Sequence, residues 1–318
     1  MPLISVCIPV FQTEQYLLRC LKSVYMQDFS DFEVIVVSDA SRGTDEKKRS
    51  AKKIVSLAQK ECKKYRKENS LIPVKIRFIE HQQNRGCVEV RRTLVYESKG
   101  SWIAMLDSDD ELMEHALTNM YEAALEASAD IVHGTFEEDS EEKKCNLIFY
   151  GTKQGKDILS GWFTGQFSGN ICGKLITKKL YEKAYESIPY TECNMADDLL
   201  IFFFIGMNAQ KYTGIKDKVY YYHLNTGMSS HRTIDSLKKW QMICSASSVF
   251  SIITQWVKEN YWEDISKSLS FVMLRYLKNS LNQLSQVVSP DLQPAAHQML
   301  CDYWGEHFVQ MVEKSMTN

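Results

Sequence analysis

Short apolar segments alternate with longer amphipathic segments over the first 135 residues, and this alternation limits the fold more than any other feature of the sequence. The short segments are apolar without a break, as expected for strands that are covered on both faces of a parallel sheet. The expected strands are 4–9, 33–38, 74–80, 102–106 and 130–135, and the expected helices are 14–25, 45–68, 88–97 and 111–126. This order predicts an α/β fold with a mostly parallel central sheet and right-handed crossovers.

The sequence changes character after residue 150. Six glycines between 151 and 173 interrupt any regular pattern, and long glycine-rich connectors usually form lids or walls of binding sites. Beyond Ile234 glycine is almost absent and helical periodicity returns. We therefore expect two parts, an α/β domain over 1–232 and an α-helical C-terminal region over 233–318.

The composition excludes several classes of protein. A formal net charge of −2 gives no overall attraction to nucleic acid, and the nine scattered cysteines contain no Cys-x-x-Cys pair that would indicate a zinc site. Reduced, buried cysteines and the absence of a leader-like N-terminus predict a cytoplasmic protein. The lysine-rich helix expected over 45–68 leaves open a peripheral contact with the inner face of a membrane, although a solvated helix face is the commoner use of such charge.

Three carboxylates follow the apolar strand 103–106 within four residues, at Asp107, Asp109 and Asp110. Adjacent carboxylates repel one another and raise one another's pKa unless positive charge neutralises them. A hard divalent cation is one partner for such oxygen ligands. The alternative is a solvated turn in which Asp110 caps the helix expected over 111–126. The cluster alone does not decide between these two interpretations.

Polar residues follow the first, second and fourth expected strands. They include Gln12 after the first strand, Asp39 after the second and Asp107 after the fourth. Ligands bind at the carboxyl ends of strands in open parallel sheets, so these residues are expected to share one rim. A nicotinamide-cofactor domain needs a glycine-rich turn after the first strand, and residues 10–16 contain no glycine. The chain also lacks a Walker-type phosphate loop, so the rim must hold phosphate through a metal and side chains.

Seven segments in order resemble motifs of the family 2 glycosyltransferases, which are inverting nucleotide-sugar enzymes of the GT-A fold. The resemblance covers about the first 230 residues. The matching segments are Ser5–Gln12 (Pro-Val-Tyr-Asn in the family), Glu33–Ser41 (Val-Asp-Asp-Gly-Ser), Asn84–Gly86 with Arg91 and Arg92 (Asn-x-Gly…Ala-Arg-Asn), Leu106–Asp110 (Asp-x-Asp-Asp), Gly173–Leu175 (Lys-Leu), Ala196–Asp198 (Glu-Asp) and Tyr222–His223 with Ser229 (Tyr-Arg…Ser).

Three departures from the family pattern matter most for activity. Gln12 replaces an Asn, Ser38 replaces the first of two Asp residues, and Arg92 replaces an Asn. These changes keep open a degenerate, non-catalytic relative that only binds nucleotide or glycan. A sugar nucleotidyltransferase is a second alternative, although such enzymes usually carry a glycine-rich basic signature after the first strand, and this chain has none.

The resemblance implies a set of donor-binding residues. A Mn²⁺ or Mg²⁺ ion held by Asp109 and Asp107 would bridge the donor diphosphate, with His223 as a weaker candidate ligand. Asp39 would bind the base, most simply uracil. Arg91 would contact the diphosphate or the base, unless it is an ordinary outward-facing helix residue. The remaining expected donor contacts are Pro9, Phe11 and Ser108.

The resemblance also implies a catalytic pair. Asp198 would be the general base that deprotonates the acceptor hydroxyl, and Asp197 would orient it or contact the acceptor. The alternative use of Asp198 is as the N-cap of the helix that follows. His231 could reach the diphosphate, and Trp162 and Phe163 could stack on an acceptor sugar, although core packing is the commoner use of such aromatics.

Together these features predict an enzyme that transfers a hexosyl or N-acetylhexosaminyl group from a UDP-linked donor. The expected acceptor is a hydroxyl of a glycan or lipid-linked sugar in cell-surface polysaccharide biosynthesis. The sequence leaves the sugar, the acceptor, the linkage and a homodimer open, and it predicts no nucleic-acid partner.

Overall fold

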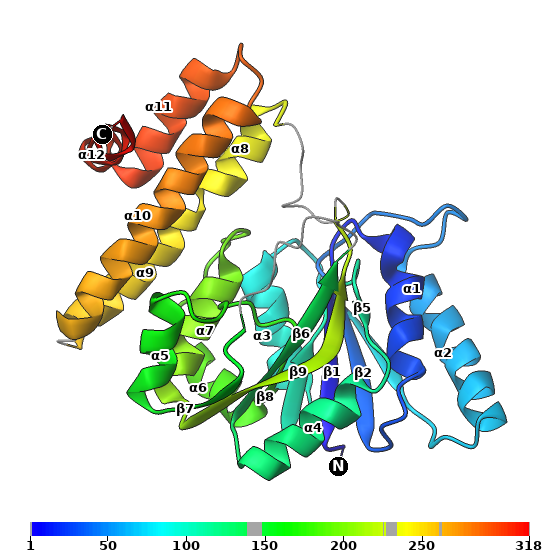
Figure 1. Cartoon of the computed structure of the whole chain (residues 1–318). Coiled ribbons are helices and arrows are strands. Elements are labelled where there is room, and N and C mark those ends of the chain that lie inside the picture. Colours follow the sequence, from blue (N-terminus) through cyan, green and yellow to red (C-terminus); the bar gives the residue numbers. More distant parts are fainter. Residues whose placement is uncertain (1, 139–147, 225, 227–233, 261–262, 318) are drawn as a thin grey trace. The chain divides into compact units, whose positions relative to one another are not determined.

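The computed structural model describes residues 2–138, 148–224, 226, 234–260 and 263–317 (Figure 1). The chain divides into two compact units. The first comprises Met1–Glu192 and Ile201–Gly227, and the second comprises Cys193–Leu200 and Met228–Asn318. The second unit therefore takes a short segment, 193–200, from the middle of the sequence of the first.

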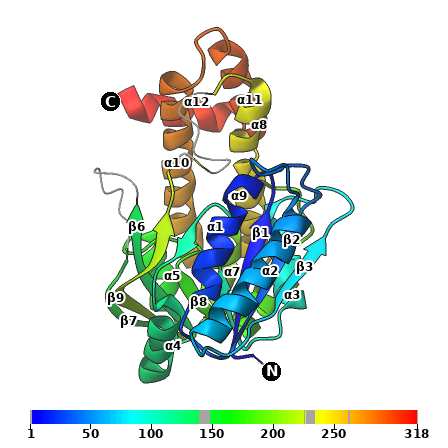
Figure 2. The same ribbon diagram turned by 90° about the vertical axis from the view of Figure 1, so that its right-hand side faces the viewer.

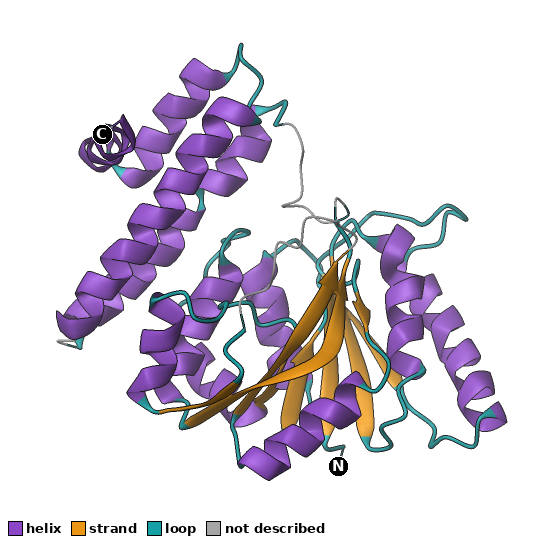
Figure 3. Cartoon of the chain, in the orientation of Figure 1, coloured by secondary structure: helices purple, strands orange, loops and turns teal. Residues whose placement is uncertain are grey.

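The first unit is built on one mixed sheet (Figures 1 and 3). Its described strands run in the order β3-β2-β1-β4-β8-β6-β9-β5, with β7 paired to β9. Strands β1, β2, β3 and β4 are mutually parallel, and β6 is parallel to β9, whereas β8, β5 and β7 pair antiparallel. The bounds are β1 Ile4–Val10, β2 Phe32–Ser38, β3 Ile76–Glu80, β4 Trp102–Met105, β5 Glu111–Leu112, β6 Ile131–Glu138, β7 Gly151–Gln154, β8 Lys174–Thr177 and β9 Lys211–Tyr222.

Helices cover the sheet of the first unit (Figures 1 and 2). Their bounds are α1 Glu14–Tyr25, α2 Ala51–Glu68, α3 Cys87–Glu97, α4 Ala116–Ala127, α5 Lys156–Phe163 and α6 Lys178–Ser187, with α7 Asp197–Asn208 beginning in the second unit and continuing in the first. Helix α3 packs on β1 and β2 and against α6, while α1 and α2 pack on each other. Burial of the apolar faces of both layers provides the main stabilisation of such an arrangement.

Helix α2 has an apolar buried face and a lysine-rich exposed face. The residues Ile54, Ala58 and Cys62 are buried at helical spacing, and most of the lysines lie on the exposed side. Arg66 is the exception, since only 1% of it is exposed and it donates to the carbonyls of Tyr25, Gln27 and Phe29. The basic character of this helix is therefore mostly a charged outer face plus one buried arginine that ties α2 to the end of α1.

Two expected helices begin later than the sequence pattern indicated. The helix expected at 45 begins at Ala51, because the Asp45 carboxylate accepts the backbone N–H groups of Lys47 and Arg49 and closes a turn there. The helix expected at 111 begins at Ala116. Residues Glu111–Leu112 instead form β5, which pairs with Tyr220–Tyr221 of β9. The prediction of a helix over 111–126 was therefore wrong at its N-terminal end, because a distant strand pairs with these backbone groups.

The region expected to be irregular contains an aromatic core. Helix α5 carries Trp162 and Phe163, which stack on each other and pack against Phe202 and Phe203 of α7. Both α5 aromatics are less than 10% exposed, so these rings pack inside the first unit. The segment 137–144 is rich in charge; its first two residues, Glu137 and Glu138, end β6, and residues 139–144 lie outside the described residues.

The described part of the second unit is mainly helical (Figure 3). Its helices are α8 Leu237–Cys244, α9 Ala246–Glu259, α10 Glu263–Gln286, α11 Gln293–Trp304 and α12 Glu306–Thr317. Trp240 is fully buried at the centre of their core and donates its indole N–H to the Ala296 carbonyl at 2.7 Å. The predicted α/β fold with C-terminal helices is confirmed. In the described parts of the chain, the helices are too short or too polar for a membrane span.

Candidate functional site

Three loops meet at the carboxyl edge of the parallel strands. Because β1, β2 and β4 run in the same direction, the loops that follow them leave the sheet on the same side. Gln12 donates its backbone N–H to the Ser41 hydroxyl at 2.8 Å, which links the loops after β1 and β2. The Thr13 and Ser108 hydroxyls lie 2.6 Å apart, which links the loops after β1 and β4. The rim expected from the strand ends is therefore present.

Pro9 and Phe11 lie at the start of this rim. Pro9 pairs with Val37 of β2, and the pairing of β1 with β4 ends earlier, at Cys7. A proline is tolerated there because β4 no longer requires a backbone N–H from β1. Both side chains are partly exposed, whereas Ser108 is 3% exposed and holds Thr13.

Asp39 anchors the loop after β3. Its carboxylate accepts backbone N–H groups from Arg85 and Gly86 at 2.9–3.0 Å and lies 2.7 Å from Nδ1 of His81. The other ring nitrogen of His81 lies 3.0 Å from the Thr93 hydroxyl. The Asp39 carboxylate is 3% exposed, so this network holds a buried carboxylate at the rim. Nothing in the sequence indicated His81, because no local pattern links it to Asp39.

Two residues of the rim adopt left-handed backbone conformations. Gln12 has φ of 57° and Ala40 has φ of 53°. Asn and Gly accept this region far more readily than Gln and Ala, and these are the residues that the family motifs carry at the two positions. The replacement at position 12 therefore has a backbone cost, while its N–H still bonds to Ser41. Strain of this kind is common at binding sites that the surrounding fold holds in place.

Arg91 lies inside the site. It is 5% exposed and donates from Nη2 to Oδ1 of Asp107 at 2.9 Å. The alternative of an outward-facing helix residue is therefore wrong, because the Arg91 side chain is buried against Asp107. The Asp107 side chain is 35% exposed. Among the described residues, no hydrogen bond reaches its second oxygen, which leaves that oxygen available to a ligand.

Asp109 is buried and carries a carboxylate with little positive charge around it. Its side chain accepts the Thr226 hydroxyl at 2.9 Å, and its backbone carbonyl accepts Nη2 of Arg19. Burial, followed by repulsion from Asp107, raises the pKa of Asp109 above its usual value.

Asp110 accepts hydrogen bonds from Tyr220 of β9 and from His223 just after that strand. It is 1% exposed and accepts the Tyr220 hydroxyl at 2.7 Å and the backbone N–H of His223 at 2.8 Å. Burial and the charges of Asp107 and Asp109 raise the pKa of Asp110 to about 8. The alternative in which Asp110 caps a following helix is wrong, because β5 follows it and β9 supplies its donors.

The site fits a divalent cation through Asp107 and Asp109. Their oxygens are hard ligands, and one oxygen of Asp107 is open. His223 fits less well, since its Nε2 lies 2.8 Å from Oε1 of Glu111. The described residues contain no group of three His, Cys, Asp or Glu side chains arranged to hold a metal, so two carboxylates, donor phosphates and water would have to complete the coordination shell.

Asp197 and Asp198 form the first turn of α7. A carboxylate in the first helical turn is favoured in its ionised form by the helix dipole, which suits a proton acceptor. Both residues belong to the second unit, whereas the rim belongs to the first. His231 and Ser229 lie outside the described residues.

Solved structures share the fold. The Staphylococcus aureus TarS fragment 1–349 in complex with UDP-GlcNAc matches with a TM-score of 0.59 and 17% identity, over 99% of this chain and 91% of that chain. The Pyrobaculum calidifontis mannosyltransferase in complex with GDP-Man and Mn²⁺ matches with a TM-score of 0.52 and 12% identity, over 99% of this chain and 73% of that chain. The chain therefore has the GT-A fold that these glycosyltransferases share.

The sequence comparison points to the same family as the motifs. Residues 5–146 match the family model "Glycosyl transferase family 2", so this part of the chain is similar to family 2 glycosyltransferases. The predicted family resemblance is thus confirmed. A curated relative, the poly(ribitol-phosphate) β-N-acetylglucosaminyltransferase TarP of Staphylococcus aureus, is 29% identical over 136 residues, which are 42% of this chain and 36% of TarP. The chain spans less than half the length of the curated relatives it matches.

Proposed function

We propose that the protein is an inverting glycosyltransferase that uses a UDP-linked sugar and a divalent cation. The observation that carries this proposal is the joining of three loops around Asp107 and Asp109 at the carboxyl edge of the sheet. Two carboxylates stand close together at this rim, and burial and repulsion from Asp107 raise the pKa of Asp109, so a cationic ligand would be favoured there. The family match over 5–146 covers the same loops.

The donor would bind along the rim. A base such as uracil would bind at the edge formed by Pro9 and Phe11, beside Asp39, whose carboxylate accepts from His81, Arg85 and Gly86. Arg91 would contact the diphosphate from beside Asp107, since a planar guanidinium suits phosphate oxygens.

Asp107 and Asp109 would hold the cation, either Mn²⁺ or Mg²⁺. When bound, the cation supplies Lewis-acid stabilisation of the negative charge on the departing nucleoside diphosphate. Ser108 would keep the backbone between the two carboxylates in place through its bond to Thr13. The Pyrobaculum calidifontis mannosyltransferase, which shares the fold, binds Mn²⁺ together with GDP-Man, and this supports the choice of ion.

Asp198 would act as the general base, with Asp197 beside it to orient it or the acceptor. The acceptor hydroxyl oxygen forms a bond to the anomeric carbon while the bond from that carbon to the diphosphate oxygen breaks. The bonding electrons leave with the nucleoside diphosphate, and the hydroxyl proton passes to Asp198. Attack from the face opposite the leaving group inverts the configuration at that carbon.

The proposed acceptor is a hydroxyl of a cell-surface glycan or of a lipid-linked sugar. The name of TarP, which describes transfer to poly(ribitol-phosphate), supports an acceptor of this class. The proposed donor site lies in the α/β part, 1–232.

Calorimetry with UDP, with GDP as the control nucleotide, tests the proposal when each is titrated with and without Mn²⁺. We expect metal-dependent binding of UDP that is lost in Asp109→Asn, whereas Asp31→Asn, at an exposed carboxylate outside the rim, should bind normally. A preference for GDP would keep the enzyme class and change the donor. Failure of both nucleotides to bind would contradict the proposal and favour a non-catalytic relative.

A further inference from the structure

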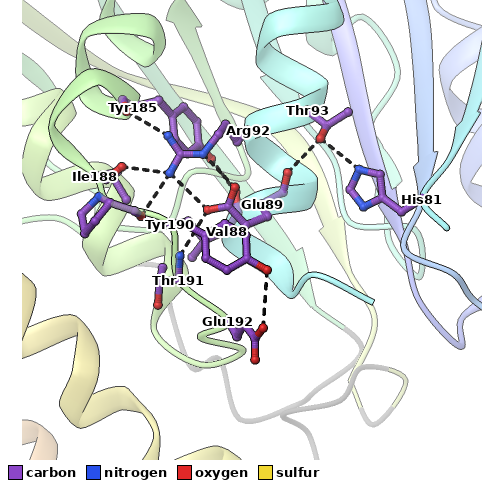
Figure 4. A network of polar contacts seen from close by, with 11 residues as sticks. His81, Val88, Glu89, Arg92, Thr93, Tyr185, Ile188, Tyr190, Thr191 and Glu192 are labelled. Atoms are coloured by element: carbon purple, nitrogen blue, oxygen red, sulfur yellow. Dashed lines mark hydrogen bonds and ion pairs between the residues drawn. The ribbon is translucent and has the colours of Figure 1, made fainter. Parts of the chain in front are cut away.

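Arg92 stands where the family motif has Asn, and the structure gives it an extensive set of contacts (Figure 4). Its guanidinium pairs with Glu89 one turn earlier on α3, with Nε to Oε2 at 2.9 Å and Nη2 to Oε1 at 3.1 Å. The guanidinium also lies over the ring of Tyr185, 4.7 Å from its centroid. The Glu89 side chain is 8% exposed and that of Arg92 is 20% exposed, so solvent screens this pair poorly.

The same guanidinium donates hydrogen bonds to the end of α6 and to the segment after it. It donates to the carbonyls of Tyr185 and Ile188 at 2.9 Å and of Pro189 at 3.1 Å. Backbone carbonyls at the end of a helix have no partner within the helix, so a cation there satisfies them and is favoured by the helix dipole.

Glu89 and Val88 of α3 make further hydrogen bonds, one to the segment after α6 and one to α6 itself. One Glu89 oxygen also accepts the backbone N–H of Thr191 at 3.4 Å. The Tyr185 hydroxyl donates to the Val88 carbonyl of α3 at 3.2 Å. Segment 188–191 is therefore fixed to α3 by polar contacts that all lie within the first unit.

A few residues separate segment 188–191 from the proposed catalytic pair, Asp197 and Asp198, in the sequence. Residues 193–200 leave the first unit, and the chain returns to it at Ile201. The returning end is anchored by apolar burial, since Ile201, Phe202 and Phe203 are fully buried. Apolar burial is smaller at the departing end, 188–191, where Ile188 is buried and Pro189 and Tyr190 are exposed. The Arg92 and Glu89 contacts provide the anchor there.

We propose that Arg92 and Glu89 are positioning residues for the catalytic turn 197–198. Their ion pair fixes the departing end of the 193–200 excursion, so that both of its ends are held. Releasing segment 188–191 increases the number of conformations open to the connection 193–196, which leads into α7, and lowers the fraction with Asp198 in a productive geometry. This inference rests on the proposed function of Asp198.

Arg92→Ala, Arg92→Lys and Glu89→Gln test the inference, with Arg77→Ala as the matched control. Arg77 is also 20% exposed and pairs with a glutamate, Glu97, and its backbone carbonyl, but it lies on β3. Arg92→Lys and Glu89→Gln keep the size and much of the polarity of the side chains, so they remain informative if the alanine variant folds poorly.

The first measurement is amide hydrogen exchange over 188–192, which requires no substrate. We expect exchange there to rise about tenfold or more in Arg92→Ala, less in Arg92→Lys and Glu89→Gln, and not at all in Arg77→Ala. The second is release of UDP from UDP-N-acetylglucosamine and UDP-glucose, with water as the acceptor. We expect kcat to fall about tenfold or more in Arg92→Ala, with KM for the donor and Kd for UDP within about twofold of wild type and partial rescue by Arg92→Lys.

The outcomes separate the two proposals. Unchanged exchange over 188–192 in Arg92→Ala would refute the anchor. Raised exchange with a kcat equal to that of Arg77→Ala would refute the positioning role and leave the proposed function intact. A wild-type protein that binds no UDP and releases none from either donor would refute the proposed function, and the positioning role with it.

Discussion

Replacing Asp110 with Asn should flatten the pH dependence of stability. Asp110 is buried beside Asp107 and Asp109, and these surroundings raise its pKa from 3.8 to about 8. At low pH the carboxyl is protonated in both the folded and the unfolded state. As pH rises above 3.8 the unfolded state releases this proton first, so the folded state loses relative stability until pH reaches about 8. Asn at this position does not titrate.

The structure sets the size of the effect. Each pKa unit corresponds to about 1.4 kcal/mol, so the interval from about pH 5 to the raised pKa of about 8 gives ~4 kcal/mol as an upper bound. Solvent at the rim reorganises around the ionised group, and we expect ~2 kcal/mol to be measurable. Loss of an accepted hydrogen bond from Tyr220 would shift the stability of the variant by ~1 kcal/mol at every pH, and this constant shift cancels in the comparison.

The assay is urea unfolding of wild type, Asp110→Asn and the exposed control Asp31→Asn at about pH 5 and about pH 9, with a chelator present to exclude metal. Wild type and Asp31→Asn should lose more stability over this interval than Asp110→Asn, by ~2 kcal/mol. Excess Mn²⁺ should reduce the loss in wild type, because a cation at Asp107 and Asp109 offsets the repulsion. Equal losses in all three proteins would refute the reasoning.

Three further changes test other parts of the structure. Ala40→Gly relieves a left-handed backbone at φ 53° and should raise the free energy of unfolding by ~0.5–1 kcal/mol in urea titrations; a loss of stability would contradict the strain. Lys174→Met removes a buried ammonium that donates to the carbonyls of Ser168 and Asn170, and should lower thermal stability by ~2 kcal/mol; an unchanged melting temperature would show that these carbonyls find other partners. Asp39→Asn weakens the hold on the loop after β3 and should lower UDP affinity about tenfold in calorimetry, whereas unaltered affinity would separate this network from the donor site.

The sequence determined the features that depend on neighbours along the chain. Strands β1 and β2 and helices α1 and α3 lie within one residue of their predicted bounds, because continuous apolar runs and helical periodicity are local signals. The placement of Asp39 and Asp107 on one rim also followed from the sequence, since parallel strands end on the same edge.

The tertiary structure decided what these residues contact. Asp110 receives its donors from Tyr220 and His223, more than 100 residues later, and β5 forms in place of a helix because β9 pairs with it. Arg92 likewise holds carbonyls more than 90 residues away, a role that its replacement of a family Asn does not indicate. Such contacts depend on which elements pack together, and no local pattern encodes that choice. The sequence by itself thus determined the class of fold and the position of the rim, and only the packing of distant elements determined which charges are paired, buried or left for a ligand.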